Sequence, residues 1–203
     1  MPRLTGAQLH EEIIAVAARL FSEKGYAATS VQQVADEMGY SKSGLLHHFS
    51  SKQQLLAAVI REPLRKLDHL DKVAAQMPQG REREAFTTAA LVEIVLEERA
   101  GIGVLLNEGV VPTDAFEERS EMAFLRQRLC NLFFPSPNLP FEAEVRINFA
   151  FAGLIDSVIR CGDIPVQEIR QPLLRAFRDS CGLVAPLPSF TEEEIRERLG
   201  FHG

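Results

Sequence analysis

The residues best suited to chemistry lie between positions 29 and 52. Hydroxyl groups precede two short predicted helices, with Thr29 and Ser30 before the first and Ser41 before the second, and lysines stand at Lys42 and Lys52. A helix N-terminus offers free backbone amides and a favourable dipole to an anion such as phosphate, and adjacent hydroxyl or ammonium groups add hydrogen bonds. The pattern predicts contacts to phosphate, while simple helix capping is the competing interpretation of Thr29 and Ser41.

Two predicted helices, near residues 31–38 and 41–49, must position these groups. The turn between them runs Met38-Gly39-Tyr40-Ser41, in which Gly39 can take the positive φ that such a turn needs. Leu45 and Phe49 are spaced to anchor the second helix in a core. The pattern predicts a helix-turn-helix, a motif whose second helix enters the DNA major groove.

Residues 13–56 resemble the N-terminal domain of the Tet repressor (TetR) family of bacterial regulators. The resemblance rests on Ala17-Ala18-Arg19-Leu20-Phe21, Lys24-Gly25-Tyr26, Thr29-Ser30-Val31, Val34-Ala35, Gly39-Tyr40-Ser41-Lys42-Ser43-Gly44, His47-His48-Phe49, Ser51-Lys52 and Leu55-Leu56. One position departs from the family, which usually has an aromatic residue, most often Tyr, where this chain has Leu46. Leu46 cannot donate a hydrogen bond, although it could touch a thymine methyl group, so this operator contact is in doubt.

The resemblance and the helix geometry together predict a DNA-contacting set. Lys42, Ser43 and Gly44 begin the second helix and should face base edges, and Lys52 resembles a phosphate-binding lysine of the family. Gln33 could contact either solvent or the DNA backbone. The full predicted set is Thr29, Ser30, Gln33, Ser41, Lys42, Ser43, Gly44, Leu46, His47, His48 and Lys52.

The whole chain is predicted to be all-α. Capping boxes at Thr5–Gln8, Thr29–Gln32, Ser51–Gln54 and Thr191–Glu194 predict helix starts, and strand signals are almost absent. Further helices are expected near 81–99, 102–109, 113–132, 141–161 and 165–181. We predict a helix-turn-helix domain over 1–50, a connecting helix over 51–80 and a ligand-binding and dimerisation domain over 81–203.

The resemblance implies that this last domain binds a small molecule and a second subunit. The segment 147–159 is apolar on nearly all sides, which predicts that it is covered on two faces. The predicted ligand pocket comprises Asn107, Glu108, Phe116, Phe124, Asn148, Phe149 and Asp156. The predicted dimer interface comprises Leu154, Val158, Leu173, Leu174 and Phe177. Glu93 is a further pocket candidate, for which a water-exposed helix face is the favoured interpretation.

Composition and charge narrow the classes of protein. The chain has 203 residues, 46% hydrophobic, with no apolar run of the roughly 20 residues that a membrane helix needs, and its N-terminus lacks a signal-peptide pattern. These features predict a cytoplasmic protein. The net charge of −6 argues against nucleic acid at first. However, residues 1–60 hold five Lys/Arg and five Asp/Glu, so the negative excess lies entirely in the remainder.

Other classes of protein were weighed against a DNA-binding regulator. The three cysteines, Cys130, Cys161 and Cys181, fit neither a disulfide framework nor a metal site, and no cofactor is predicted. An enzyme would need Cys161 with a histidine base, yet no catalytic motif is present, and we predict no enzyme. A helical small-molecule binder without DNA binding and a transcriptional activator stay open as alternatives. The leading hypothesis is a homodimeric, ligand-responsive repressor of operator DNA.

Overall fold

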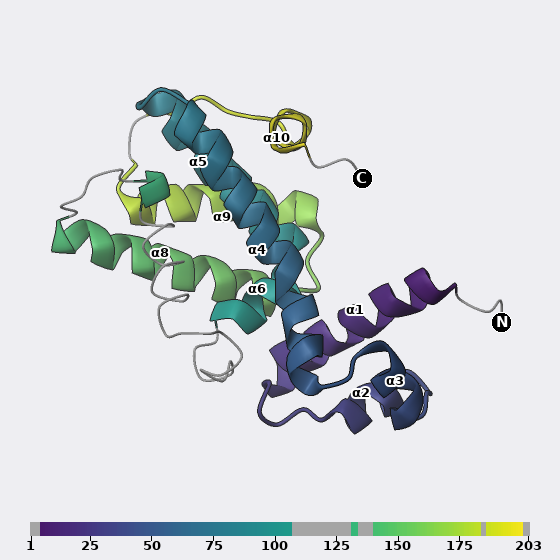
Figure 1. The fold of residues 1–203 in the computed structure, drawn as a ribbon. Coiled ribbons are helices and arrows are strands. Elements are labelled where there is room, and N and C mark those ends of the chain that lie inside the picture. Colours follow the sequence, from purple (N-terminus) through teal and green to yellow (C-terminus); the bar gives the residue numbers. More distant parts are fainter. Residues whose placement is uncertain (1–4, 107–130, 134–139, 184–185, 201–203) are drawn as a thin grey trace. The chain divides into compact units, whose positions relative to one another are not determined.

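The computed structural model describes residues 5–106, 131–133, 140–183 and 186–200 (Figure 1). Within these ranges every regular element is a helix, which confirms the all-α prediction. The helices are α1 (Gly6–Lys24), α2 (Val31–Glu37), α3 (Lys42–His48), α4 (Lys52–Gln76), α5 (Arg81–Glu97), α6 (Arg99–Leu106), α8 (Phe141–Arg160), α9 (Val166–Cys181) and α10 (Glu192–Leu199). None of these described helices is long and apolar enough to cross a membrane.

The chain divides into two compact units. Unit 1 comprises residues 1–64 and 100–118, and unit 2 comprises residues 65–99 and 119–203. The boundary falls inside α4, so the first half of that helix belongs to unit 1 and the second half to unit 2.

In unit 1, short helices begin at side-chain caps and close around a small apolar core. Thr5 and Gln8 form a capping box that starts α1, as predicted. The core buries Ile13 and Phe21 of α1, Val34 of α2 and Leu45 of α3, each at most 2% exposed. Apolar burial of this kind is the main force holding such short helices, which are not stable alone.

The contact between α6 and α4 in unit 1 depends on a glycine. A Cβ added at Gly101 would lie 2.7 Å from Pro63 Cγ and 3.0 Å from the carbonyl oxygen of Val59. Pro63 has no N–H to offer that carbonyl, so α4 lacks one helical hydrogen bond where α6 meets it. Any side chain at position 101 would force the two helices apart.

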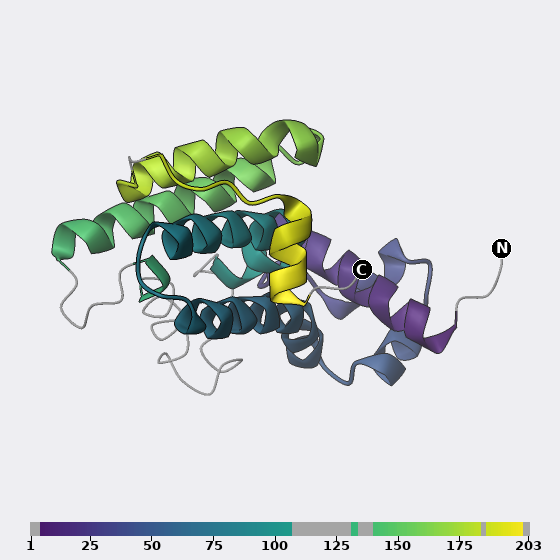
Figure 2. The same ribbon diagram turned by 90° about the horizontal axis from the view of Figure 1, so that it is seen from above.

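Unit 2 is built from longer helices. The segment 85–96 of α5 is buried on all sides, and α8 and α9 lie side by side, joined by a short turn (Figures 1 and 2). Both follow prolines, Pro140 and Pro165, and have no side-chain cap. The C-terminal α10 runs across α5 (Figure 2) and begins at the predicted Thr191–Glu194 capping box.

Candidate nucleic-acid interface

The start of α2 is capped one residue later than the sequence suggested. Ser30 is the N-cap: its hydroxyl accepts the Gln33 N–H at 3.2 Å, while Gln33 Oε1 accepts the Ser30 N–H at 2.7 Å. Both residues are exposed at this helix N-terminus, and both remain predicted DNA contacts. Gln33 therefore also has a structural role as the partner of the cap, which the Ser-x-x-Gln pattern of residues 30–33 indicates.

Thr29 was predicted to present its hydroxyl to phosphate, and that prediction is wrong. Its side chain is buried, and the hydroxyl lies 2.9 Å from the carbonyl oxygen of Gly25 and 3.2 Å from that of Leu20. These carbonyls belong to the C-terminal end of α1, where helical acceptors lack backbone partners. Thr29 thus fastens the loop between α1 and α2.

The helix α3 has one buried face and one exposed face. Leu45 is 1% exposed and anchors the helix, with Phe49 just after it stacked on the His10 ring at 4.5 Å between centroids. The predicted contacts Lys42, Ser43, Leu46 and His47 are all exposed. Their i, i+4 spacing places them on one side of α3. No described residue pairs with the Lys42 ammonium.

The turn that presents α3 is shaped by two glycines and a serine. Gly39 has a φ of 69°, and the following Tyr40 N–H donates to the Ala35 carbonyl at 2.9 Å. Ser41 is the N-cap of α3 and accepts the Gly44 N–H at 3.1 Å. A Cβ at Gly44 would lie 3.2 Å from the Ser41 hydroxyl, so this glycine relieves crowding at the cap. Gly44 therefore has a role at the cap besides the close approach to DNA predicted for it.

Lys52 and His48, both predicted to contact DNA, are partly occupied by contacts or burial within unit 1. The Lys52 ammonium lies 4.1 Å from the centre of the Tyr26 ring and donates to the Ala27 carbonyl at 3.4 Å, and its burial lowers the Lys52 pKa. Lys52 is the first residue of α4, and its side chain holds the loop between α1 and α2 through these two contacts. His48 is half-buried beside the core. The predicted capping box at Ser51–Gln54 forms only in part. The Ser51 hydroxyl accepts the Gln54 N–H, but Gln54 Oε1 accepts the N–H of Ser50 instead of that of Ser51.

The predicted dimer interface in unit 2 is instead core. Its five residues, all at most 8% exposed, are Leu154, Val158, Leu173, Leu174 and Phe177. They face inward where α8 and α9 pack together, and Phe177 meets the rings of Phe133 and Phe151 at 5.5 and 5.4 Å between centroids. Because α8 is apolar on several faces, its pattern could not show which face a second subunit would use.

The predicted ligand pocket is also revised. Phe149 is 73% exposed, and Asp156 is exposed and paired with Arg160 at 2.8 Å, so both lie on the outside of α8. Asn148 is half-buried. The other four predicted residues, Asn107, Glu108, Phe116 and Phe124, lie outside the described residues.

Glu93 is buried rather than water-exposed. Its Oε1 lies 2.6 Å from Arg170 Nε, close enough for an ion pair although that N–H meets no acceptor in hydrogen-bond geometry. Burial raises the Glu93 pKa, and Arg170 opposes that rise. Arg170 also pairs with Glu192 at 2.6 Å, which links α5, α9 and α10.

The remaining titratable groups of the described residues include two cysteines and no cluster suited to a metal ion. No group of three His, Cys, Asp or Glu side chains there could hold a metal ion. Cys181 is 2% exposed, and burial raises its pKa to about 12, which keeps the thiol protonated. Cys161, at the C-terminal end of α8, is half-buried.

Comparison with known proteins points in the same direction as the geometry. A family model described as "Bacterial regulatory proteins, tetR family" matches residues 13–59. The chain is 33% identical over 106 residues to the uncharacterized HTH-type transcriptional regulator YerO of Bacillus subtilis (strain 168), covering 50% of this chain and 36% of YerO. It is 29% identical over 188 residues to the HTH-type transcriptional repressor KstR2 of Rhodococcus jostii (strain RHA1), covering 86% of this chain and 91% of KstR2.

The fold is shared with solved structures. SCO3833, a member of the TetR transcriptional regulator family from Streptomyces coelicolor A3, matches with a TM-score of 0.59 at 24% identity, covering 86% of this chain and 91% of that one. The chain spans from about a quarter to about half of the length of the first curated relatives it matches.

Capped α2 and α3 joined by a glycine turn, in an otherwise helical chain, define a helix-turn-helix protein. Residues 13–59 match the tetR family of bacterial regulatory proteins, so this helix-turn-helix is of the tetR type.

Proposed function

We propose that the chain is a transcriptional repressor that binds a palindromic operator as a homodimer and leaves it when a small, largely apolar effector binds. The observation that carries the proposal is the exposed face of α3, formed by Lys42, Ser43, Leu46 and His47. A cation without a described partner and small polar groups at a capped helix start are suited to base edges and phosphates. Relatives named as repressors, such as KstR2, support the direction of regulation.

The charge distribution indicates how the DNA would be held. Arg19 in unit 1 is engaged by Glu23 and Glu37, and Lys52 is engaged by Tyr26, so Lys42 is the cation best placed for a base contact. We therefore expect few phosphate contacts and a modest dependence of affinity on salt.

The test is fluorescence anisotropy of the intergenic DNA beside the protein's own gene. We expect salt-sensitive binding, weakened by about tenfold or more in Lys42→Ala, the loss typical of one base contact. Lys72→Ala is the matched control, because Lys72 is an exposed lysine of unit 2 paired with Asp68. Absence of binding at micromolar protein, or equal losses in both variants, would contradict the proposal, and so would a log–log salt slope of about −10.

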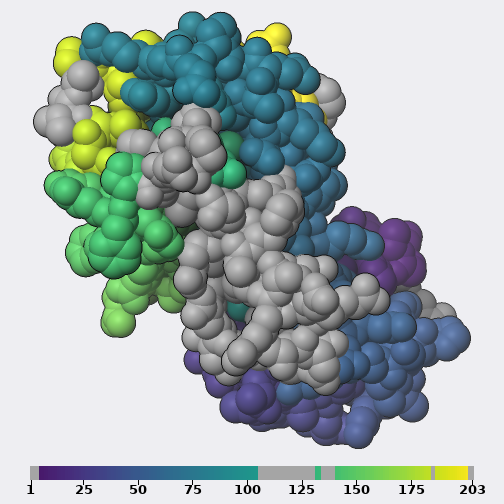
Figure 3. Space-filling view, turned by 60° about the vertical axis from the view of Figure 1, so that its left-hand side comes forward, coloured from purple at the N-terminus to yellow at the C-terminus, as the bar shows by residue number. Residues whose placement is uncertain are grey.

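We propose that the second copy binds the outer face of α8. Phe141, Val145, Phe149 and Ile159 are 80%, 49%, 73% and 44% exposed, and their spacing places them along one side of the helix. Figure 3 shows α8, in green, on the surface of unit 2. Phe141, Val145 and Phe149 follow one another at i, i+4 spacing, and exposed large apolar side chains grouped in this way mark an interaction site. On a palindromic operator, a dimeric helix-turn-helix protein places its two recognition helices about 34–36 Å apart, in successive major grooves.

Sedimentation velocity tests this interface. We expect a dimer for the unaltered chain and a monomer for Phe149→Glu, because a carboxylate would be buried without a partner. Gln79→Glu adds the same charge at an exposed position between α4 and α5 and should leave the dimer intact. A Phe149→Glu protein that remains dimeric would place the interface elsewhere.

A further inference from the structure

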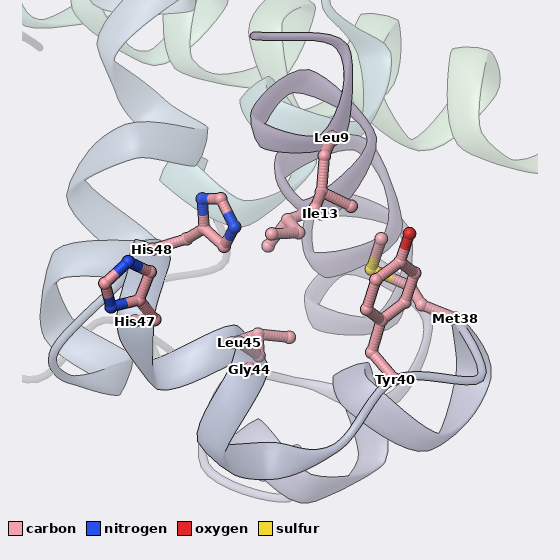
Figure 4. Close-up of a pocket in the computed structure, with 8 residues that line it drawn as sticks. All are labelled: Leu9, Ile13, Met38, Tyr40, Gly44, Leu45, His47 and His48. Atoms are coloured by element: carbon pink, nitrogen blue, oxygen red, sulfur yellow. The ribbon is translucent and has the colours of Figure 1, made fainter. Parts of the chain in front are cut away.

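A cavity of about 280 Å³ lies inside unit 1, between α1 and the recognition helix (Figure 4). Ile13 of α1 and Leu45 of α3 form its apolar floor and are 2% and 1% exposed. Figure 4 shows the α1 side chains facing α3 across the hollow, with His47 and His48 to one side and Met38 and Tyr40 to the other. The site is separate from the effector-binding region expected in residues 81–203.

The lining is almost entirely apolar, with a few polar groups at its edges that could orient a small molecule. The polar groups are the imidazoles of His47 and His48 and the hydroxyl of Tyr40, none of which is hydrogen-bonded by a described residue. A neutral imidazole offers one donor and one acceptor, and a phenol hydroxyl offers both. The volume is just below the range of about 300–1,000 Å³ typical of drug-sized ligands, and well above the roughly 150 Å³ that accommodates benzene.

We propose that this cavity binds a small substituted aromatic molecule with one hydrogen-bonding group, such as a phenol, and that its occupancy weakens operator binding. The ring lies against Leu9, Ile13 and Leu45, while its polar group meets the histidines. His47 lines the cavity and also lies on the exposed face of α3, so the ligand and the DNA compete for contact with the same side chain. The regulatory part of this inference rests on the proposed function; the binding part does not.

The probe is 4-fluorophenol, added at low millimolar concentration to the full chain without DNA. We expect its fluorine NMR signal to shift and broaden, and the backbone amide signals of Leu9, Tyr40 and His48 to move. Leu9→Phe fills the cavity and should abolish these changes, whereas Ile14→Phe, a half-buried α1 position outside the lining, should preserve them. Tyr40→Ala is a second variant that does not disturb the core, since Tyr40 is 42% exposed, and it should weaken binding.

Amide shifts confined to unit 2, shifts that persist in Leu9→Phe and Tyr40→Ala, or no shift at all would each overturn the cavity proposal. With operator DNA present, 4-fluorophenol should weaken binding by about fivefold, at the lower end of typical coupling between two sites. An unchanged affinity would overturn the regulatory part. Failure to bind any operator would contradict the proposed function and leave the DNA-free NMR result intact, so the two failures are distinguishable.

Discussion

Units 1 and 2 hold their helices by different kinds of interaction. In unit 1, α1, α2 and α3 each begin at a hydroxyl cap three residues from its backbone partner. In unit 2, the short α10 also begins at a capping box, but the long α8 and α9 have no side-chain cap, and ion pairs such as Glu93–Arg170 join residues far apart in the sequence. Local interactions can be read from a short stretch of sequence, whereas those of unit 2 depend on which helix faces pack together.

The largest change in the free energy of unfolding should come from Leu154. A substitution there tests whether this residue belongs to the core of unit 2 or to a dimer interface. Leu154→Ala removes a side chain that is 3% exposed, and we expect the free energy of unfolding to fall by about 4 kcal/mol. This loss should not depend on protein concentration in urea titrations followed by circular dichroism. Phe149→Ala is the control, because Phe149 is 73% exposed and its loss should appear only as a concentration-dependent change. If both variants lost equal stability, and both losses depended on protein concentration, Leu154 would contact a second subunit as first predicted.

Two arginines of α9 test how a buried charge affects stability, because one has an acidic partner and the other has nitrogens without hydrogen-bond partners. Arg170→Met leaves Glu93 buried without its counter-charge, and we expect the free energy of unfolding to fall by about 3 kcal/mol. Arg178 has two buried nitrogens without hydrogen-bond partners, and burial lowers its pKa. Arg178→Met should therefore raise stability, by about 1 kcal/mol. Urea titrations of both variants check the opposite signs, and a loss in Arg178→Met would show that its charge is satisfied in the folded protein.

The contrast between the units also explains which predictions held. The all-α class, the Thr5 and Thr191 capping boxes and the buried Leu45 followed from local patterns. The predicted phosphate contact of Thr29 was wrong because Thr29 and Ser30 both have a hydroxyl that could cap α2, and the conformation of the loop decides which of the two is buried. Leu154 is buried rather than at the predicted interface, and Phe149 is exposed rather than in the predicted pocket, because nothing in an apolar helix marks which face meets α9.

A smaller effect is expected from the cap of α2. Ser30→Ala removes the acceptor for the Gln33 N–H, and we expect unit 1 to lose about 1 kcal/mol. Ser22→Ala is the same chemical change inside α1, where alanine favours the helix, so it should be neutral or stabilising. Hydrogen exchange of α2 amides measures the difference. Faster exchange in both variants, or in neither, would show that the cap does not set the stability of α2.

The smallest effect is the pH dependence that Glu93 gives to unit 2. Burial raises its pKa above the ordinary 4.5, so the folded state keeps this proton over a range in which the unfolded chain has lost it. Stability from this group is therefore present below pH 4.5 and is lost as pH rises through the raised folded value.

Glu93→Gln cannot titrate, and Arg170 keeps its pair with Glu192 in this variant, so its lost contact with Glu93 should add an offset independent of pH. The stability of the unaltered chain minus that of Glu93→Gln should fall as pH rises from 4.5 toward neutrality in paired urea titrations. A difference that rises with pH would mean that Arg170 outweighs burial and holds the carboxylate charged. In that case the ion pairs of unit 2 would stabilise the fold by charge attraction, and the loss expected for Arg170→Met would grow.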